Sequence, residues 1–408
     1  MENIFSHNLT GIDLDTRAKQ LSQFALLLKA CQKDAAFADA HCMPNVLTMP
    51  KPWNKETQGP IQDMLHIYFQ GEATNQQKEE IMVCFDLMQN ADSLGSIMKF
   101  NISESTGLLI KQTTDYWCSQ KIVPEEVRTQ IATFKLILTL TEKYHALVMN
   151  PPYMGGGNMN GVLSKYVKDE YTKAKADLFS VFMQMGMERL ISKGKMAQIN
   201  MQSWMFLSSF EELRTQLLEK YNIDNMLHLG PRTFDELSGE VVQNTAFVLS
   251  KHEPTEQGGM YYRLVDGKNC ADKEQLFLSH INGNVDGNRI YYPNVEQMNF
   301  ENIPGAPIGY WCSKKFIYNF SATPCSKIAD FKSGMSTTDN ERFLRSWYEV
   351  NFFNIGFKVN SIDETITRKE KWYPYNKGGQ FRKWFGNREL VVNWKNNGGQ
   401  VLNRSAKI

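Results

Sequence analysis

Residues 144–157 read YHALVMNPPYMGGG, a mostly apolar run that leads directly into two prolines. The run predicts a buried β-strand over 144–150. The prolines end it, because proline lacks the backbone N–H that a strand ladder requires. Open α/β sheets bind their ligands at the carboxyl ends of their strands. The tetrapeptide Asn150-Pro151-Pro152-Tyr153 therefore stands where such a sheet would carry a functional site.

Strands and helices alternate on both sides of this tetrapeptide. Upstream, residues 8–15 fit a strand, 16–33 a helix with apolar residues at helical spacing, and 44–49 a short strand. Downstream, a helix at 177–194 precedes strands at 195–201, 222–230 and 241–251. This alternation predicts an α/β fold with a mainly parallel sheet covered on both faces. The mostly helical stretch 54–142 is expected to be an insertion.

Chance rarely produces Asn-Pro-Pro-Tyr. At ordinary residue frequencies it is expected in roughly one chain in a thousand of this length. The alternative is a proline loop that only ends the strand and turns Tyr153 into the core. The position at a strand end favours the functional interpretation.

The tetrapeptide after an apolar strand resembles the catalytic motif of methyltransferases that act on the amino group of adenine in DNA. Four further segments are similar to the large adenine methyltransferases of BREX-type phage defence and of type IIG restriction–modification systems. They are GIDLDTRAKQLSQFALLLKA (11–30), SGMSTTDNERFLRSWYEV (333–350), KWYPYNKGGQFRKWFGN (371–387) and VVNWKNNG (391–398). The resemblance implies a Rossmann-like class I methyltransferase sheet, S-adenosyl-L-methionine as cofactor and double-stranded DNA as partner. Other defence-system proteins are further candidate partners.

The chemistry of adenine N6 explains these residue types. The amine is a poor nucleophile because its lone pair is delocalised into the ring. The Asn150 side-chain oxygen and the Pro151 carbonyl can accept its two N–H groups and localise that lone pair. Pro151 and Pro152 stiffen the loop, so that the acceptors are already in place. Tyr153 can stack on a base that has left the duplex.

The resemblance also assigns two residues away from the tetrapeptide. The acid that binds the cofactor ribose corresponds to Asp13, with Asp15 as the neighbouring alternative. An acid before a helix can instead serve as its N-cap. Phe234 stands where the family often places a second aromatic ring against the flipped base; a core or loop role is the alternative. Gly155-Gly156-Gly157 is interpreted as a flexible loop, because no Lys-Ser/Thr follows as in a phosphate-binding loop.

Two departures from the family pattern shape our expectation of the chain's extent. Only 12 residues precede Asp13, too few for a first strand with its glycine-rich cofactor loop. The C-terminal segment also lacks the family's long recognition region. We therefore expect a piece of a larger enzyme, truncated at both ends. Its expected parts are a catalytic core at 1–252, a connector at 253–325 and the start of a DNA target-recognition domain at 326–408.

The C-terminal segment differs in charge from the rest. Residues 331–408 hold 14 Lys and Arg against 7 Asp and Glu, a net charge of +7, whereas the whole chain carries +1. Basic and aromatic residues interleave from 371 to 395, as nucleic-acid contact requires. We predict that Lys377, Arg382, Lys383 and Arg388 bind DNA. A small subdomain with packed aromatic rings and a solvated basic surface is the alternative.

The remaining composition excludes other classes of protein. The seven cysteines are scattered without a C-x-x-C pair, which argues against a disulfide framework and a zinc site and fits the cytoplasm. No metal is expected. No apolar run is long enough to cross a membrane, and the N-terminus does not resemble a signal peptide.

Two other functions stay open. One is a catalytically inactive DNA-binding or scaffold remnant of a defence complex, which the absent cofactor loop favours. The other keeps the fold but methylates RNA or a protein glutamine amide. The basic, aromatic C-terminal segment favours DNA.

Overall fold

The computed structural model describes residues 3–39, 42–234, 242–254, 258–283, 290–330, 335, 337 and 339–401. The chain divides into two compact units, residues 1–322 and 323–408. Parts of the expected target-recognition stretch, residues 331–334, 336, 338 and 402–408, lie outside the described residues. None of the described helices is long and apolar enough to cross a membrane.

The first unit opens with a small parallel sheet. Strand β1 (Thr10–Asp13) pairs with β2 (Asn45–Thr48), and helix α1 (Thr16–Lys33) connects them. Asp15 caps α1, because its carboxylate accepts the backbone N–H groups of Arg17 and Ala18. Leu21, Phe24 and Leu28 of α1 are exposed, and of the described residues of this helix only Ala30 is buried.

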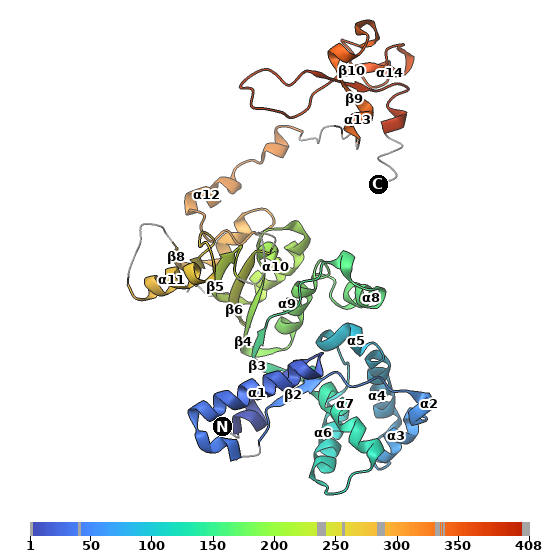
Figure 1. The fold of residues 1–408 in the computed structure, drawn as a ribbon, viewed down its shortest axis with the longest axis vertical. Helices are drawn as coiled ribbons and strands as arrows, with labels where there is room; N and C mark the ends of the chain where they lie inside the picture. Colours follow the sequence, from blue (N-terminus) through green and yellow to red (C-terminus); the bar gives the residue numbers. More distant parts are fainter. Residues whose placement is uncertain are drawn as a thin grey trace. The chain divides into compact units, whose positions relative to one another are not determined.

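Helices alone fill the next part of the first unit (Figure 1). Their core contains a cluster of aromatic rings from Tyr68, Phe69, Phe85 and Phe134, with centroids 4.2–5.7 Å apart. Two of the longer helices begin at capping residues, Thr74 for α4 and Ser103 for α6. The helices are α2 (Lys55–Gln58), α3 (Ile61–Tyr68), α4 (Asn75–Met88), α5 (Ala91–Leu94), α6 (Glu104–Ser119) and α7 (Glu125–Thr141).

A six-stranded sheet forms the centre of the first unit, in the order β3-β4-β6-β5-β7-β8. Its strands are β3 (Tyr144–Met149), β4 (Leu190–Met201), β5 (Asn222–Gly230), β6 (Asn244–Ser250), β7 (Gly259–Arg263) and β8 (Tyr291–Val295). Helices α8 (Gly161–Glu170), α9 (Leu178–Glu188), α10 (Glu211–Lys220), α11 (Cys270–Ile281) and α12 (Lys314–Tyr318) complete the unit. The mixed α/β fold class predicted from the sequence is confirmed.

The sheet is less parallel than the alternation predicted. β3 is parallel to β4 and β5 to β7, but β6 is antiparallel to both β4 and β5, and β8 is antiparallel to β7. No helix separates β5 from β6 among the described residues, so these two strands pair antiparallel. Residues 253–325, which show no clear period in the sequence, contribute two strands to the sheet.

The expectation of a buried strand at 144–150 is wrong. β3 lies at the edge of the sheet and, within the described residues, pairs only with β4. Its Val148 is 82% exposed. The apolar run indicates a strand, but local sequence does not determine whether a strand lies at the centre or the edge of a sheet.

The second unit is built on a three-stranded antiparallel sheet, in the order β10-β11-β9. Its small core contains Leu344, Tyr373 and Val392. The elements are α13 (Asn340–Phe343), β9 (Leu344–Ser346), α14 (Glu364–Thr367), β10 (Trp372–Tyr375) and β11 (Leu390–Asn393).

Candidate active site

The tetrapeptide Asn150-Pro151-Pro152-Tyr153 follows β3 directly, at its carboxyl end. Asn150 and Pro152 are exposed, Pro151 is buried and Tyr153 is half-buried. Strands β4, β5 and β7 run in the same direction as β3, so their carboxyl ends lie at the same edge of the sheet. The four residues therefore stand at the edge where α/β sheets bind ligands, as predicted.

Tyr153 is fixed at two points. Its hydroxyl accepts a hydrogen bond of 2.9 Å from the Asn244 side-chain amide, and its ring packs edge-on against Phe179 with centroids 6.2 Å apart. Burial raises the pKa of the Tyr153 hydroxyl, and the hydrogen bond from Asn244 opposes this shift. The hydroxyl is therefore neutral at physiological pH, and the ring is held in a defined position.

Asp177 fixes the loop that follows the tetrapeptide. Its carboxylate accepts the backbone N–H of Met154 at 3.0 Å and that of Phe179 at 3.2 Å, so it also caps α9. Burial raises the pKa of this carboxyl group, against the lowering effect of its backbone hydrogen bonds. One side chain thus joins the loop beside Tyr153 to the helix that carries Phe179.

A buried pair of asparagines lies next to the Tyr153 hydroxyl. Asn244 donates to the Asn200 backbone carbonyl at 3.3 Å, and the Asn200 side chain accepts from the Trp204 indole at 3.1 Å. Both asparagines are fully buried, and Asn244 Oδ1 and Asn200 Nδ2 have no hydrogen-bond partner within the described residues. A buried polar atom without a partner is costly, so this place can accept a water molecule or a polar group of a ligand.

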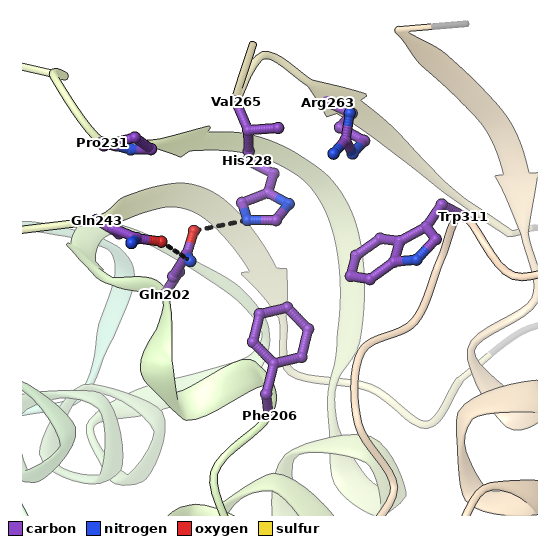
Figure 2. A pocket seen from close by; sticks show the side chains of 8 residues that line it. All are labelled: Gln202, Phe206, His228, Pro231, Gln243, Arg263, Val265 and Trp311. Atoms are coloured by element: carbon purple, nitrogen blue, oxygen red, sulfur yellow. Dashed lines mark hydrogen bonds between the residues drawn. The ribbon is translucent and has the colours of Figure 1, made fainter. Parts of the chain in front are cut away.

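A cavity of about 390 Å³ lies at the same edge of the sheet (Figure 2). Gln202 follows β4, Pro231 follows β5 and Gln243 precedes β6. Figure 2 shows the Gln202 side chain hydrogen-bonded to both His228 and Gln243. The other lining residues are Phe206, Arg263, Val265 and Trp311. Small-molecule sites have volumes of about 300–1,000 Å³, so the cavity lies at the small end of this range.

Hydrogen bonds determine the protonation of His228. Its Nδ1 lies 2.9 Å from the Tyr310 hydroxyl, and its Nε2 lies 2.6 Å from the Gln202 side-chain oxygen. The Gln202 oxygen only accepts, so Nε2 carries the proton and Nδ1 accepts from Tyr310. Burial lowers the pKa of His228 to about 4. The cavity is thus lined by a neutral imidazole, amide groups, aromatic faces and the Arg263 guanidinium.

The two acids at the end of β1 have different surroundings. Asp15 is the cap of α1, and its hydrogen bonds from the Arg17 and Ala18 backbones lower the pKa of its carboxyl group. Asp13 is half-buried and uses one oxygen, Oδ1, to accept the Asp15 N–H at 2.9 Å. Its other oxygen has no hydrogen-bond partner within the described residues.

Phe234 is half-buried and lies four residues after the end of β5. No ring contact between Phe234 and Tyr153 occurs in the described part of the chain. The structure therefore brings the four residues of the tetrapeptide together at one strand end. Within the described residues, no hydrogen bond or ring contact joins Asp13 or Phe234 to them.

The four predicted DNA-binding residues, Lys377, Arg382, Lys383 and Arg388, lie together in the second unit, in the loop between β10 and β11. All four are exposed, and none forms an ion pair within the described residues. No cluster of three or more His, Cys, Asp or Glu that could hold a metal ion occurs in that part of the chain.

The mixed α/β fold carries Asn-Pro-Pro-Tyr at the carboxyl end of a strand, the arrangement that the resemblance to class I methyltransferases implied. The chain belongs to the Eco57I restriction-modification methylase family, whose model matches residues 7–234. This match confirms the resemblance that the sequence indicated.

Two curated relatives match almost the whole chain. It is 38% identical to the adenine-specific methyltransferase PglX of Lacticaseibacillus casei (strain Zhang), over 98% of this chain and 33% of the relative. It is 34% identical to the adenine-specific methyltransferase BrxX of Escherichia coli O9:H4 (strain HS), over 99% of this chain and 34% of the relative. The chain thus spans about a third of the length of the curated relatives that it matches.

Among solved structures, a cryo-electron-microscopy structure of a DrdV–DNA complex matches 67% of this chain and 23% of that chain. The sequence identity is 13% and the TM-score 0.39.

Asn244 and Asp177 are not evident from the sequence as site residues. Asn244 lies 91 residues after Tyr153, and no local pattern indicates that the two side chains meet. Asp177 had a detectable signal, since an acid directly before an apolar helix predicts an N-cap. That signal does not reveal its bond to Met154.

Proposed function

We propose that this chain forms the catalytic part of an enzyme that transfers a methyl group from S-adenosyl-L-methionine to N6 of an adenine flipped out of duplex DNA. The enzyme would act in a phage-defence or restriction–modification system. The observation that carries the proposal is the strand end itself, where Asn150 is exposed beside a Tyr153 held by Asn244 and Phe179. Family membership supports it.

The tetrapeptide would act on the amine in three ways. The Asn150 side-chain oxygen and the Pro151 carbonyl accept the two N6 hydrogens as the nitrogen becomes tetrahedral. The prolines keep both acceptors in place before the base arrives. The Tyr153 ring supplies a stacking surface for the flipped base, worth about 1–3 kcal/mol. Phe234 is proposed as the second ring at the base.

Asp13 fits the ribose of the cofactor. It is half-buried at the carboxyl end of a strand, and only one of its oxygens has a hydrogen-bond partner within the described residues. A carboxylate so placed can accept both ribose hydroxyls. The neighbouring Asp15 is committed to capping α1, which favours Asp13 over Asp15 for this role. The bound cofactor would supply the methyl group.

DNA binding is proposed for the second unit. Lys377, Arg382, Lys383 and Arg388 are exposed and close in sequence, as phosphate contacts require. The division into a catalytic core at 1–252, a connector at 253–325 and the start of a target-recognition domain at 326–408 is kept as a proposal, in which the connector contributes β7 and β8 to the central sheet. Proteins of the same defence system are proposed as further partners.

One observation favours a second candidate, a DNA-binding role without catalysis. Asp13 lies in the sheet β1-β2 and Asn150 follows the sheet that begins with β3, and no strand joins the two sheets within the described residues. A cofactor that needs both residues would then require a further element between them. Methylation of RNA or of a protein glutamine remains an alternative substrate class.

The test is transfer of a labelled methyl group to duplex DNA, RNA and a glutamine peptide in parallel, followed by digestion and mass spectrometry. We expect N6-methyladenine from duplex DNA only. N4-methylcytosine or labelled RNA or peptide would contradict the proposed substrate. Duplex binding without any transfer would favour the non-catalytic candidate.

A further inference from the structure

The loop between β10 and β11, residues 376–389, carries aromatic rings that are largely exposed within the part of the chain that the structure describes. Phe381 and Trp384 are each 90% exposed, and Phe385 is 73% exposed. By contrast, Tyr373 on β10 is only 8% exposed and belongs to the core of this unit. Tyr373 therefore contributes to the packing of the second unit, whereas the three rings of the loop contribute almost nothing to it.

The tip of this loop has a defined shape. The Asn387 side chain donates a hydrogen bond of 3.3 Å to the Gln380 carbonyl, which closes residues 381–386 into a short loop. Gly386 packs so closely against Arg382 that an added Cβ would lie 2.5 Å from Arg382 Cγ. The three rings thus project from a closed tip.

The loop is also strongly basic. Residues 376–389 contain Lys377, Arg382, Lys383 and Arg388 against the single acid Glu389, a net charge of +3. Two of these cations lie over the loop rings. Lys383 Nζ is 5.9 Å from the Trp384 ring centroid, and Arg388 Cζ is 4.2 Å from that of Phe385. Positively charged groups and aromatic rings thus lie next to each other at the tip of the loop.

We propose that this tip inserts its rings among the bases of double-stranded DNA while its cations hold the phosphates. The observation is the combination of exposed aromatic rings with cations that form no ion pair among the residues that the structure describes. Duplex DNA offers both complements, since side-chain wedges can enter a base step and phosphates flank each step. The proposal rests on DNA as the substrate in the proposed function. It adds that the rings, not only the cations, contact the DNA.

The two contributions respond differently to salt. Phosphate contacts release counterions, so their loss reduces the slope of log K against log salt by about 1 for each contact. Stacking releases no counterions. Loss of a stacked ring lowers affinity by about 5- to 150-fold and leaves the slope unchanged, from about 1–3 kcal/mol per stacked base.

The experiment measures binding of the full chain to a mixed-sequence duplex between 50 and 300 mM salt, without cofactor. Trp384→Ala and Phe381→Ala are compared with Arg382→Ala. Phe353→Ala is the matched control, because Phe353 is 89% exposed in the same unit, outside the loop. We expect the ring variants to lose affinity at constant slope, Arg382→Ala to reduce the slope, and the control to bind like the original chain. Trp384→Phe should restore most of the affinity.

A second measurement follows the DNA itself. Closed circular DNA that a topoisomerase relaxes in the presence of the chain should end with a changed linking number, and Trp384→Ala should abolish the change. Unchanged affinity in both ring variants, or a ring variant that changes only the slope, would overturn the proposal. Preferential binding to vesicles of anionic lipid over the duplex would do the same. These outcomes do not depend on methyl transfer, so they are distinguishable from failure of the proposed catalysis.

Discussion

The side-chain amide of Asn244 donates a 2.9 Å hydrogen bond to the hydroxyl of Tyr153, which joins the first residue of β6 to the last residue of Asn-Pro-Pro-Tyr. The sheet order places β4 between the two strands involved. The bond therefore runs across β4, at the end of the sheet where Asn150 lies.

A double-mutant cycle measures this bond. Tyr153→Phe removes the hydroxyl and Asn244→Ala removes the amide, and urea unfolding gives the free energy of each variant. We expect a coupling of about 1 kcal/mol, typical of a neutral hydrogen bond in a protein. Asn244→Ala should also destabilise the chain by itself, because Asn244 bonds to the Asn200 carbonyl. Strictly additive effects would show that the two side chains do not interact.

His228 should make the chain less stable at acid pH. Its pKa is lowered to about 4 in the folded state and is about 6.5 when unfolded, so below pH 6.5 the unfolded state binds the extra proton. The contribution of His228 to the free energy of unfolding is fully present above pH 6.5 and is lost as the pH falls toward 4. The loss amounts to about 2 kcal/mol between pH 7 and pH 4.5.

Urea unfolding at both pH values tests the role of His228. The His228→Gln variant should not show this loss of stability at acid pH. The His145→Gln variant, changed at an exposed histidine of β3, should still show it. Equal pH dependence in the His228→Gln variant and the original chain would show that His228 is not held neutral.

Cofactor binding should depend on Asp13. Asp13 is half-buried at the end of β1, and only one of its oxygens has a hydrogen-bond partner within the described residues. We expect calorimetry with S-adenosyl-L-methionine to show weaker binding by Asp13→Asn than by the original chain, because the amide has a single oxygen to accept the ribose hydroxyls. Asp15→Asn should leave binding unchanged, since Asp15 caps α1. Equal affinity of the Asp13→Asn variant and the original chain would contradict this assignment.

The cations of the β10–β11 loop should bind DNA without regard to sequence. Replacing Arg382, Lys383 and Arg388 together by alanine should weaken binding similarly for unrelated duplexes and reduce the salt slope by about 3. Filter binding across a salt series measures both quantities. Replacing Lys314, Lys315 and Lys327, which are exposed residues outside the loop, provides a charge-matched control. An unchanged slope in the loop variant would mean that these side chains only face solvent.

The sequence predicted the parts of this fold that depend on local pattern. The helical spacing of α1, the strand before Asn150 and the helix cap at Asp15 are all recognisable from nearby residues. The position of the tetrapeptide at a ligand-binding edge follows from the strand that precedes it.

Features that depend on distant partners were not predictable. The exposure of Val148 depends on which strands flank β3, and the antiparallel direction of β6 depends on its pairing with β4 and β5. The bond from Asn244 to Tyr153 requires the folded sheet. Likewise, the aromatic residues of 371–395 look alike in sequence. Only the structure separates the buried Tyr373 from the exposed Trp384.

The most direct test of the proposed catalysis is single-turnover methyl transfer to an adenine-containing duplex by Asn150→Ala. It uses this chain or, if the gene encodes one, the longer protein. Asn150 should act mainly in the transition state, so its loss should lower the transfer rate by about 10²–10³ while DNA and cofactor binding stay nearly unchanged. Tyr153→Ala should weaken capture of the flipped base as well, and Tyr153→Phe should keep most activity. Transfer near the original rate by Asn150→Ala, or transfer to cytosine N4 in duplexes without adenine at the target, would contradict the account.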